Sequence, residues 1–258
     1  MSDVSPYRPT ERFSGLSELY ARHRPTYPAA ALDLIQARCG LGPGALLVDV
    51  GCGTGISTRL FAARGVPVIG IDPNDDMRAR AEAMTPPPGG PAPEYRQGTA
   101  EATGLPDGCA AAVLAAQAFH WFDAPAALRE FRRVLRSGGH VALVWNDCDD
   151  DDPCTAAYQA VVGRWPVGRL GGTGPLASDA LLHSPLFAAD ECVRFRNEQE
   201  LDEEGLLGRA SSVSWAPREA AAEAEIGRRL REVFAAHRRD GRVTLRYVTS
   251  VYLARRRD

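Results

Sequence analysis

The sequence contains no lysine, and all 30 of its basic residues are arginine, against 33 acidic residues. This absence excludes mechanisms that need a lysine amine, such as Schiff-base formation or the phosphate-binding lysine of a P-loop. The net charge of −3 gives the chain as a whole no attraction for nucleic acid or for an anionic membrane. We therefore expect no nucleic-acid and no membrane partner, and both a monomer and a homodimer fit.

The sequence also lacks features of membrane and metal proteins. It has no apolar run of about 18 residues, and residues 1–13 lack the apolar centre of a signal peptide. The six cysteines form no Cys-x-x-Cys pair, as a zinc ribbon or a thioredoxin-like site would require. Five aspartates crowd into residues 147–152, but without a companion histidine they favour a solvated loop or helix start over a cation site. We predict a cytoplasmic protein without a bound metal.

Short apolar runs alternate with helical patterns over the first ~150 residues. Residues 45–50 and 66–72 are typical of parallel strands buried on both faces. Further strand candidates lie at 94–98, 111–119 and 140–147, and helix candidates at 57–65, 75–84 and 123–139, the last ending at Gly138 and Gly139.

The last hundred residues follow a different pattern. Residues 191–201 and 242–256 are longer strand candidates, separated by a helical region at 219–239. Such a pair can form an antiparallel edge on a parallel sheet. The sequence therefore predicts an α/β protein with a Rossmann-like, doubly wound, mostly parallel seven-stranded sheet and an antiparallel C-terminal edge pair.

Three glycines, Gly51, Gly53 and Gly55, follow the first strand and open a helix. They predict exposed backbone N–H groups against which a ligand can lie, above the carboxyl ends of the strands. Asp72 ends the next strand about 20 residues on, where an acid can accept hydrogen bonds from a ribose. The spacing differs from the dinucleotide fingerprint, and Asp49 would repel a pyrophosphate but suits an ammonium group. This favours an adenosine compound with an amino-acid tail over NAD.

The motifs VDVGCGTG, IGIDP, GTAEATGLP and LRSGGHVALVW, in this order, resemble those of class I S-adenosylmethionine-dependent methyltransferases. Within that superfamily, YARHRPTYP and AQAFHWFD resemble the trans-aconitate methyltransferase-like branch of small-molecule enzymes. The resemblance covers roughly residues 20–147 and implies S-adenosyl-L-methionine as the cofactor. It suggests one domain over residues 1–258, in which 1–40 cover the cofactor, 41–147 bind it and 148–258 face the acceptor.

The resemblance also implies the cofactor-binding positions. They are Tyr20, Arg24, Asp49, Gly51, Cys52, Gly53, Gly55, Asp72, Pro73, Met77, Ala100, Glu101, Gln117 and Ala118. Asp49 would lie near the methionine ammonium, Asp72 would bind the ribose, and Arg24 would pair with the cofactor carboxylate. Thr99 stands where many relatives carry an aspartate for the adenine amine.

The acceptor side gives weaker signals. The candidates to line it are Phe119, His120, Trp121, Trp145 and Trp215. His120 is the candidate catalytic residue, as a general base, and the alternative is a structural hydrogen-bonder. A carboxylate acceptor would need no base, and Arg24, Arg169 and Arg194 are candidates to bind one. Two other functions stay open: an RNA or protein methyltransferase on the same fold, and a non-catalytic cofactor-binding protein.

Overall fold

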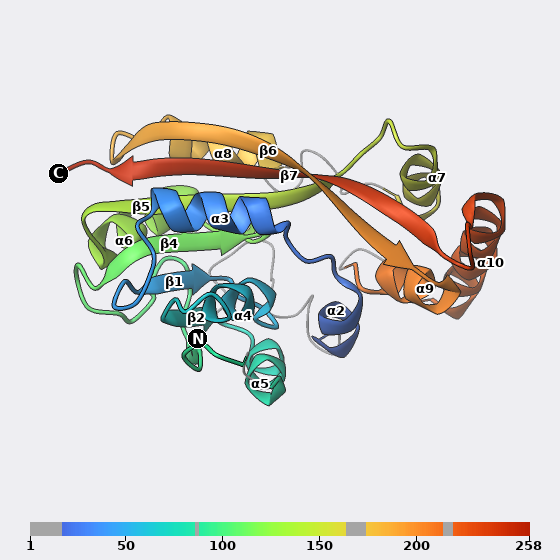
Figure 1. Ribbon diagram of the computed structural model, residues 1–258, viewed down its shortest axis with the longest axis horizontal. Coiled ribbons are helices and arrows are strands. Elements are labelled where there is room, and N and C mark those ends of the chain that lie inside the picture. The colour runs from blue at the N-terminus through green and yellow to red at the C-terminus, as the bar shows by residue number, and fades with distance from the viewer. Residues whose placement is uncertain (1–16, 86–87, 164–173, 214–218) are drawn as a thin grey trace.

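A computed structural model of the chain describes residues 17–85, 88–163, 174–213 and 219–258. Its strands form one seven-stranded sheet in the order β3-β2-β1-β4-β5-β7-β6 (Figure 1). The strands are β1 (Leu47–Val50), β2 (Val68–Asp72), β3 (Glu94–Gln97), β4 (Ala110–Ala116), β5 (Leu135–Cys148), β6 (Phe187–Leu201) and β7 (Val243–Arg256). The reversal of strand order beside β1 places a ligand crevice at the carboxyl ends of β1 and β4.

Strands β1 to β5 pair in parallel, whereas β7 pairs antiparallel with both β5 and β6. The predicted mostly parallel sheet with an antiparallel C-terminal pair is therefore confirmed. The predicted helix over 123–139 is too long, because the helix ends at Val134 and β5 begins at Leu135. Leu135 pairs with Ala110, and this contact with a distant strand replaces the last helical turn.

The described helices connect the strands and flank the sheet. They are α2 (Ser17–His23), α3 (Ala29–Arg38), α4 (Ile56–Ala62), α5 (Asp75–Ala83), α6 (Ala124–Val134), α7 (Pro153–Val162), α8 (Gly174–Leu182), α9 (Glu203–Ser211) and α10 (Ala220–His237), with the 3-10 helix η1 (Phe119–Trp121). Asn74, Asp123, Asp152 and Asp202 begin α5, α6, α7 and α9, and each side chain accepts a backbone N–H three residues on. These caps satisfy N–H groups that a helix leaves free in its first turn.

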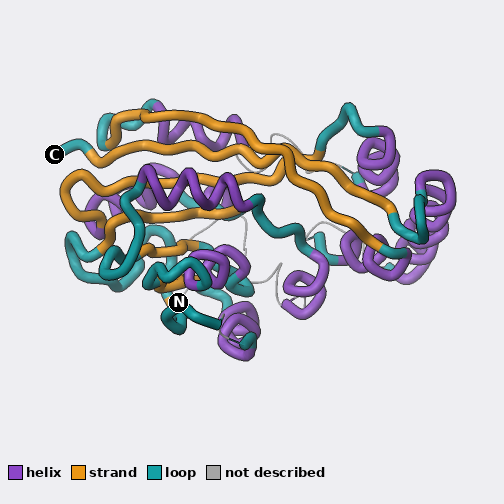
Figure 2. The backbone as a smooth tube through the Cα atoms, in the orientation of Figure 1, coloured by secondary structure: helices purple, strands orange, loops and turns teal. Residues whose placement is uncertain are grey.

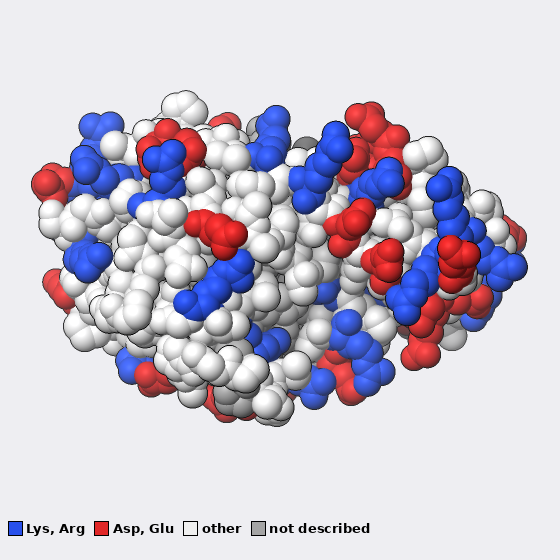
Figure 3. Space-filling view, in the orientation of Figure 1, with Lys and Arg blue, Asp and Glu red and all other residues white. Residues whose placement is uncertain are grey.

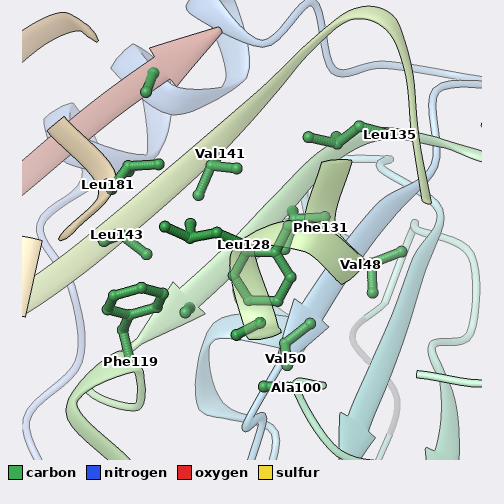
Figure 4. Close-up of a cluster of buried hydrophobic side chains, with 14 of the residues drawn as sticks. Val48, Val50, Ala100, Phe119, Leu128, Phe131, Leu135, Val141, Leu143 and Leu181 are labelled. Carbon is green, nitrogen blue, oxygen red and sulfur yellow. The ribbon is translucent and has the colours of Figure 1, made fainter. Parts of the chain in front are cut away.

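Both faces of the sheet are covered. On one face, α6 and α8 bury a cluster that includes Val48, Val50 and Phe131 (Figure 4). On the other face, α3 and α4 bury a second cluster that includes Leu47. Because side chains alternate along a strand, Asp49 lies on the same side of β1 as Leu47. A carboxylate is thus placed among apolar groups on the α4 side of the sheet.

The long strands β5, β6 and β7 run beyond the parallel strands. They have 14, 15 and 14 residues, against 4 in β1. Their far ends meet α7, α9 and α10, which bury a third apolar cluster. We call these three helices and the strand ends that they cover the distal module. The arrowheads of β1 and β4 point toward it (Figure 1), so it lies beyond the carboxyl ends of the parallel strands. Figure 2 shows its helices grouped at the far ends of the long strands.

The surface of the distal module carries charges of both signs. Arginine and acidic side chains lie side by side over it on the face drawn in Figure 3. None of the described helices combines the length and the apolar content that a membrane span requires.

Candidate active site

The backbone N–H groups of the glycine-rich loop between β1 and α4 are hydrogen-bonded within the protein. The N–H groups of Gly51 and Cys52 donate to the Ile71 carbonyl oxygen at 2.8 and 3.2 Å. The Gly55 N–H donates to the carbonyl oxygen of Cys52 at 2.9 Å. The prediction of exposed amide groups is therefore wrong at these residues, because the loop uses the amides to fasten itself to β2.

The glycines are needed for two different reasons. Gly51, Gly53 and Gly55 have φ angles of 69°, 53° and 74°, in the left-handed region that glycine tolerates best. A Cβ on Gly51 would lie only 2.6 Å from the Cβ of Ala118, so the loop after β4 packs directly on the main chain there. A Cβ on Gly53 would meet nothing within 4 Å. Gly53 is thus the described glycine of this loop that faces open space, where a ligand can approach the backbone.

Asp72 ends β2 and shares its carboxylate with the loop. Its Oδ2 accepts the Gly53 N–H at 2.8 Å, and its Oδ1 accepts the Asn74 N–H at 2.9 Å. Burial raises the pKa of Asp72 and these amide hydrogen bonds lower it, with a net rise. Each carboxylate oxygen retains acceptor capacity, because it has two lone-pair directions and one described donor. The geometry is that of an acceptor held in place for further hydroxyl donors.

Asp49 is fully buried beside the glycines. Its Oδ2 accepts the hydroxyl groups of Ser57 and Thr58, both at 2.6 Å. Its Oδ1 is buried and accepts from no group in the described part of the chain. Burial raises the pKa of Asp49 to about 6, against the two hydroxyl hydrogen bonds and with help from the negative charge of Asp72. An ionised oxygen without a donor is costly in an apolar setting, so this position favours a cationic donor.

The residues predicted on the adenine side lie in the loops after β2 and β3 and in the first turn of α5. Met77 and Ala100 are each 3% exposed, while Pro73 is half-buried. Glu101 is partly engaged, because its Oε1 accepts the Asp123 N–H at 2.9 Å. This bond ties the loop after β3 to the start of α6. Contacts of these residues with an adenine stay predictions.

Gln117 and Ala118 form the turn after β4. Gln117 has a φ of 58°, which is uncommon for a residue with a side chain. Two hydrogen bonds to β5 hold it there: its N–H donates to the Val144 carbonyl oxygen at 2.8 Å and its Nε2 to the Asn146 carbonyl oxygen at 3.2 Å. The turn is therefore fixed between β1, which it touches through Ala118, and β5.

His120 is a hydrogen-bond acceptor at one ring nitrogen. The Trp145 indole N–H donates to His120 Nδ1 at 3.3 Å. An indole nitrogen can only donate, so Nδ1 carries no proton and the neutral ring holds its proton on Nε2. Burial, reinforced by the charge of Arg24, lowers the pKa of His120 to about 4. This arrangement favours the structural alternative over a general base.

The aromatic residues predicted to line the acceptor site are mostly core residues. Phe119 is 2% exposed and packs edge-on against Phe122 at 5.8 Å between ring centroids, within the cluster of Figure 4. Trp145 is 2% exposed and packs edge-on against Tyr252 at 5.7 Å. Trp121 is 7% exposed. Phe119 and Trp145 thus pack in the core, and their contact with an acceptor stays a prediction. Trp215 and Arg169 lie outside the described residues.

Arg24 follows α2 and lies over the Tyr20 ring, with 4.7 Å from its guanidinium carbon to the ring centroid. Its Nη2 donates to the Ser212 carbonyl oxygen at 2.9 Å, while its Nε is buried without an acceptor among the described residues. Burial, then Tyr20 and then Asp49 raise the pKa of Tyr27 well above 10, and Arg24 opposes the rise. The charges of Asp49 and Arg24 thus both act on the pKa of Tyr27, which places Arg24 in the same site as Asp49.

The segment after Arg24 is tied to three strands. The side-chain amides of Asn146 and Asn197 both donate to the Thr26 carbonyl oxygen, at 3.1 and 2.8 Å. Thr249 Oγ1 donates to Asn146 Oδ1 at 2.6 Å and orients that amide. The bonds hold residues 24–27 beside β5, β6 and β7. Neither asparagine was singled out in the sequence, since each stands alone within a strand pattern.

Sequence reasoning also missed three buried polar residues of the distal module, Tyr158, Arg209 and Tyr247. They are 3%, 7% and 2% exposed. The one available signal was an arginine within the apolar spacing of α9. Arg194, which the sequence did propose, is exposed on β6.

The aspartate run is partly a helix start. Asp152 begins α7, and its Oδ2 accepts the N–H and the hydroxyl of Thr155 at 2.9 and 2.8 Å. Within the ranges that the structure describes, no group of three or more His, Cys, Asp or Glu residues is arranged to hold a metal ion.

Comparison with known proteins agrees with this geometry. Residues 48–143 match the family model of a methyltransferase domain. An uncharacterized methyltransferase of Mycobacterium tuberculosis is 37% identical over 145 residues, which are 56% of each chain. The malonyl-[acyl-carrier protein] O-methyltransferase of Serratia marcescens is 33% identical over 131 residues, which are 48% of this chain and 49% of that one. The chain thus spans about half the length of the curated relatives it matches.

A solved structure extends the likeness beyond that region. A candidate type II methyltransferase from Anaeromyxobacter dehalogenans superposes with a TM-score of 0.62 at 26% identity, covering 91% of this chain and 97% of that one. Strand order, glycine loop, paired acids and family match therefore agree. The chain thus contains a region, residues 48–143, that matches a methyltransferase domain, within a Rossmann-like fold that it shares with solved methyltransferase structures.

Proposed function

We propose that the protein transfers a methyl group from S-adenosyl-L-methionine to a small-molecule acceptor. The observation that carries this proposal is the pair of acids beside the glycine loop. Asp49 has a buried oxygen without a described donor, and Asp72 is fixed by two amides with capacity for more. A Cβ on Gly53 would meet nothing within 4 Å, and the Gly53 N–H donates to Asp72, so open space adjoins this acid.

The residues present fit this cofactor. Asp49 Oδ1 matches an ammonium, Asp72 matches two ribose hydroxyls, and the unpartnered Nε of Arg24 matches a carboxylate. Pro73, Met77, Ala100 and Glu101 would hold the adenine, and Tyr20, Gln117 and Ala118 would close the site. When bound, the cofactor supplies an electrophilic methyl group on a sulfonium. The protein's part is to bind and orient the acceptor and to exclude water.

The state of His120 supports an acceptor that is already ionised at neutral pH. A ring with its proton on Nε2 and a pKa of about 4 takes up a proton poorly, so His120 positions the turn after β4 through Trp145. A carboxylate acceptor needs no base. The motifs YARHRPTYP and AQAFHWFD support the trans-aconitate methyltransferase-like branch, and the malonyl-directed O-methyltransferase among the relatives is consistent with an acidic acceptor.

The test is calorimetric titration of S-adenosylhomocysteine into the wild type, Asp72→Ala and Asp72→Asn. We expect the wild type to bind and both variants to lose at least about tenfold in affinity, since each removes a charge-assisted acceptor. Asp33→Ala, at an exposed aspartate, is the matched control and should bind like the wild type. Absence of binding to the folded wild type would refute the proposal. Binding without methylation of any acid offered would favour a non-catalytic binder.

A further inference from the structure

Two arginines meet where α2 packs on α9. His23, the last residue of α2, lies so close to Gly208 that a Cβ there would overlap its ring. This contact brings Arg24, the next residue, against α9, where its Nη2 donates to the Ser212 carbonyl oxygen at 2.9 Å. Arg209 lies one turn earlier in α9 and is 7% exposed. Burial, and then the charge of Arg209, lower the pKa of Arg24, so the two guanidinium groups share one site.

Three donors of this site have no acceptor among the described residues. They are Arg24 Nε, Arg209 Nη1 and the Tyr158 hydroxyl, all buried. The other edge of Arg209 is occupied, because its Nε donates to the Tyr247 hydroxyl at 3.4 Å. Tyr247 in turn donates to Gln199 Oε1 at 3.2 Å. One edge of the Arg209 guanidinium is thus bonded within the fold, and Nη1 on the other side can donate to a bound ligand.

The site also lacks negative charge. In the described ranges no carboxylate pairs with Arg24 or Arg209, whereas Arg133 pairs with both the buried Glu130 and the exposed Asp107. Burial raises the pKa of Tyr158 to about 12 and also raises that of Tyr247, so neither phenol is charged at neutral pH. Arginine stays protonated. Two buried positive charges without a counter-ion destabilise the site, and a bound anion would offset this cost.

The proposed function accounts for one of the two charges. A cofactor bound at Asp49 and Asp72 brings a single carboxylate, assigned to Arg24, together with a positive sulfonium. Arg209 then remains unpaired in a site whose positive charge the sulfonium increases. We propose that Arg209 and Tyr158 bind a carboxylate of the acceptor, with α9 and α7 each contributing one of the two donors. This inference rests on the proposed function.

A carboxylate suits this site better than a phosphate. Arg209 offers one free edge, and one guanidinium matches the single charge of a carboxylate. A phosphate group carries up to two charges and more acceptor oxygens than these donors can satisfy. The exposed Arg194 offers no comparable site, because a surface guanidinium is already solvated.

The experiment is calorimetric titration of acetate, malonate and inorganic phosphate, each with and without saturating S-adenosylhomocysteine. The variants are Arg209→Met and Tyr158→Phe. Arg228→Met is the matched control, since Arg228 is exposed on α10 and pairs with Glu225 and Glu232. We expect the wild type to bind a carboxylate, Arg209→Met to lose about tenfold or more, and Tyr158→Phe about threefold or more. The control should bind like the wild type.

Melting temperatures and the affinity for S-adenosylhomocysteine distinguish a ligand-binding role of Arg209 and Tyr158 from a purely structural role. Both variants should keep the wild-type affinity for S-adenosylhomocysteine within about twofold. Their melting temperatures should be equal to the wild type or higher, because each variant removes a buried donor without an acceptor. Three results would each overturn the proposal. The wild type could bind neither acetate nor malonate, it could bind phosphate more tightly than either, or both variants could bind the carboxylates as tightly as the wild type does. Failure of S-adenosylhomocysteine to bind would refute the proposed function instead, and titrations without it would still test Arg209.

Discussion

The buried carboxylate of Asp49 predicts a specific dependence of stability on pH. Burial raises its pKa from 3.8 to about 6 in the folded protein, while the unfolded chain keeps the ordinary value. Between these two values the folded state holds a proton that the unfolded state has lost. The free energy of unfolding therefore falls as the pH rises through this window. A shift of about two units corresponds to about 3 kcal/mol in total.

The assay is urea unfolding of the wild type and Asp49→Asn at several values from about pH 4 to pH 7.5. Asparagine does not titrate, so the variant should lack the part of the fall that Asp49 causes. Asp72, whose pKa burial also raises, contributes to the fall in both proteins, so the difference between them isolates Asp49. Asp33→Asn, at an exposed aspartate, should run parallel to the wild type. A wild-type-minus-variant difference that does not change with pH would refute the reasoning.

The same carboxylate predicts how cofactor affinity changes with pH. If the ligand ammonium pairs with ionised Asp49, binding must remove the proton that the folded protein holds below about pH 6. The affinity for S-adenosylhomocysteine should therefore rise with pH and level off above that value. In Asp49→Asn the rise should disappear.

Two further predictions concern the loops after β1 and β4. Gly51→Ala places a Cβ 2.6 Å from Ala118 at a φ of 69°, so we expect urea unfolding to show a loss of about 2–3 kcal/mol. Gly53→Ala, with open space at its Cβ, should cost only the backbone strain of about 1 kcal/mol, and an equal loss in both would contradict the packing argument. His120 should stay neutral from pH 8 to about pH 5, so its ring proton resonances should not titrate in that range. A midpoint above about pH 6 would restore it as a candidate base.

Sequence sufficed for the sheet because its signals are local. Short apolar strands bounded by glycine and acidic residues predict parallel, doubly buried strands wherever they occur, and the two longer runs predict the antiparallel edge. The end of α6 was missed because it depends on Leu135 pairing with Ala110, which lies 25 residues earlier. The glycines at 138 and 139 predict where a helix could stop, but they do not predict that Leu135 pairs with a strand.

The candidate site divides in the same way. Asp49 and Asp72 could be assigned from their places at strand ends next to the glycines. The hydrogen-bond partners of the loop N–H groups could not be predicted, since Gly51 and Cys52 donate to Ile71 on a neighbouring strand. Arg209 could not be assigned from its place in α9 alone, because its burial depends on Tyr247 and Tyr158, which come from other elements.

The shared hydrogen bond at Thr26 has a consequence for the order in which the protein matures. Residues 24–27 leave the ribosome early, but two of the groups that hold them, the amides of Asn146 and Asn197, are synthesised more than a hundred residues later. Thr249, which orients one of those amides, follows later still, in β7. The segment is therefore synthesised long before the groups that fix it. A ribosome-bound chain that stops before β7 can form the parallel strands yet leaves residues 24–27 undocked, and the cofactor site becomes complete only after β7 has been synthesised.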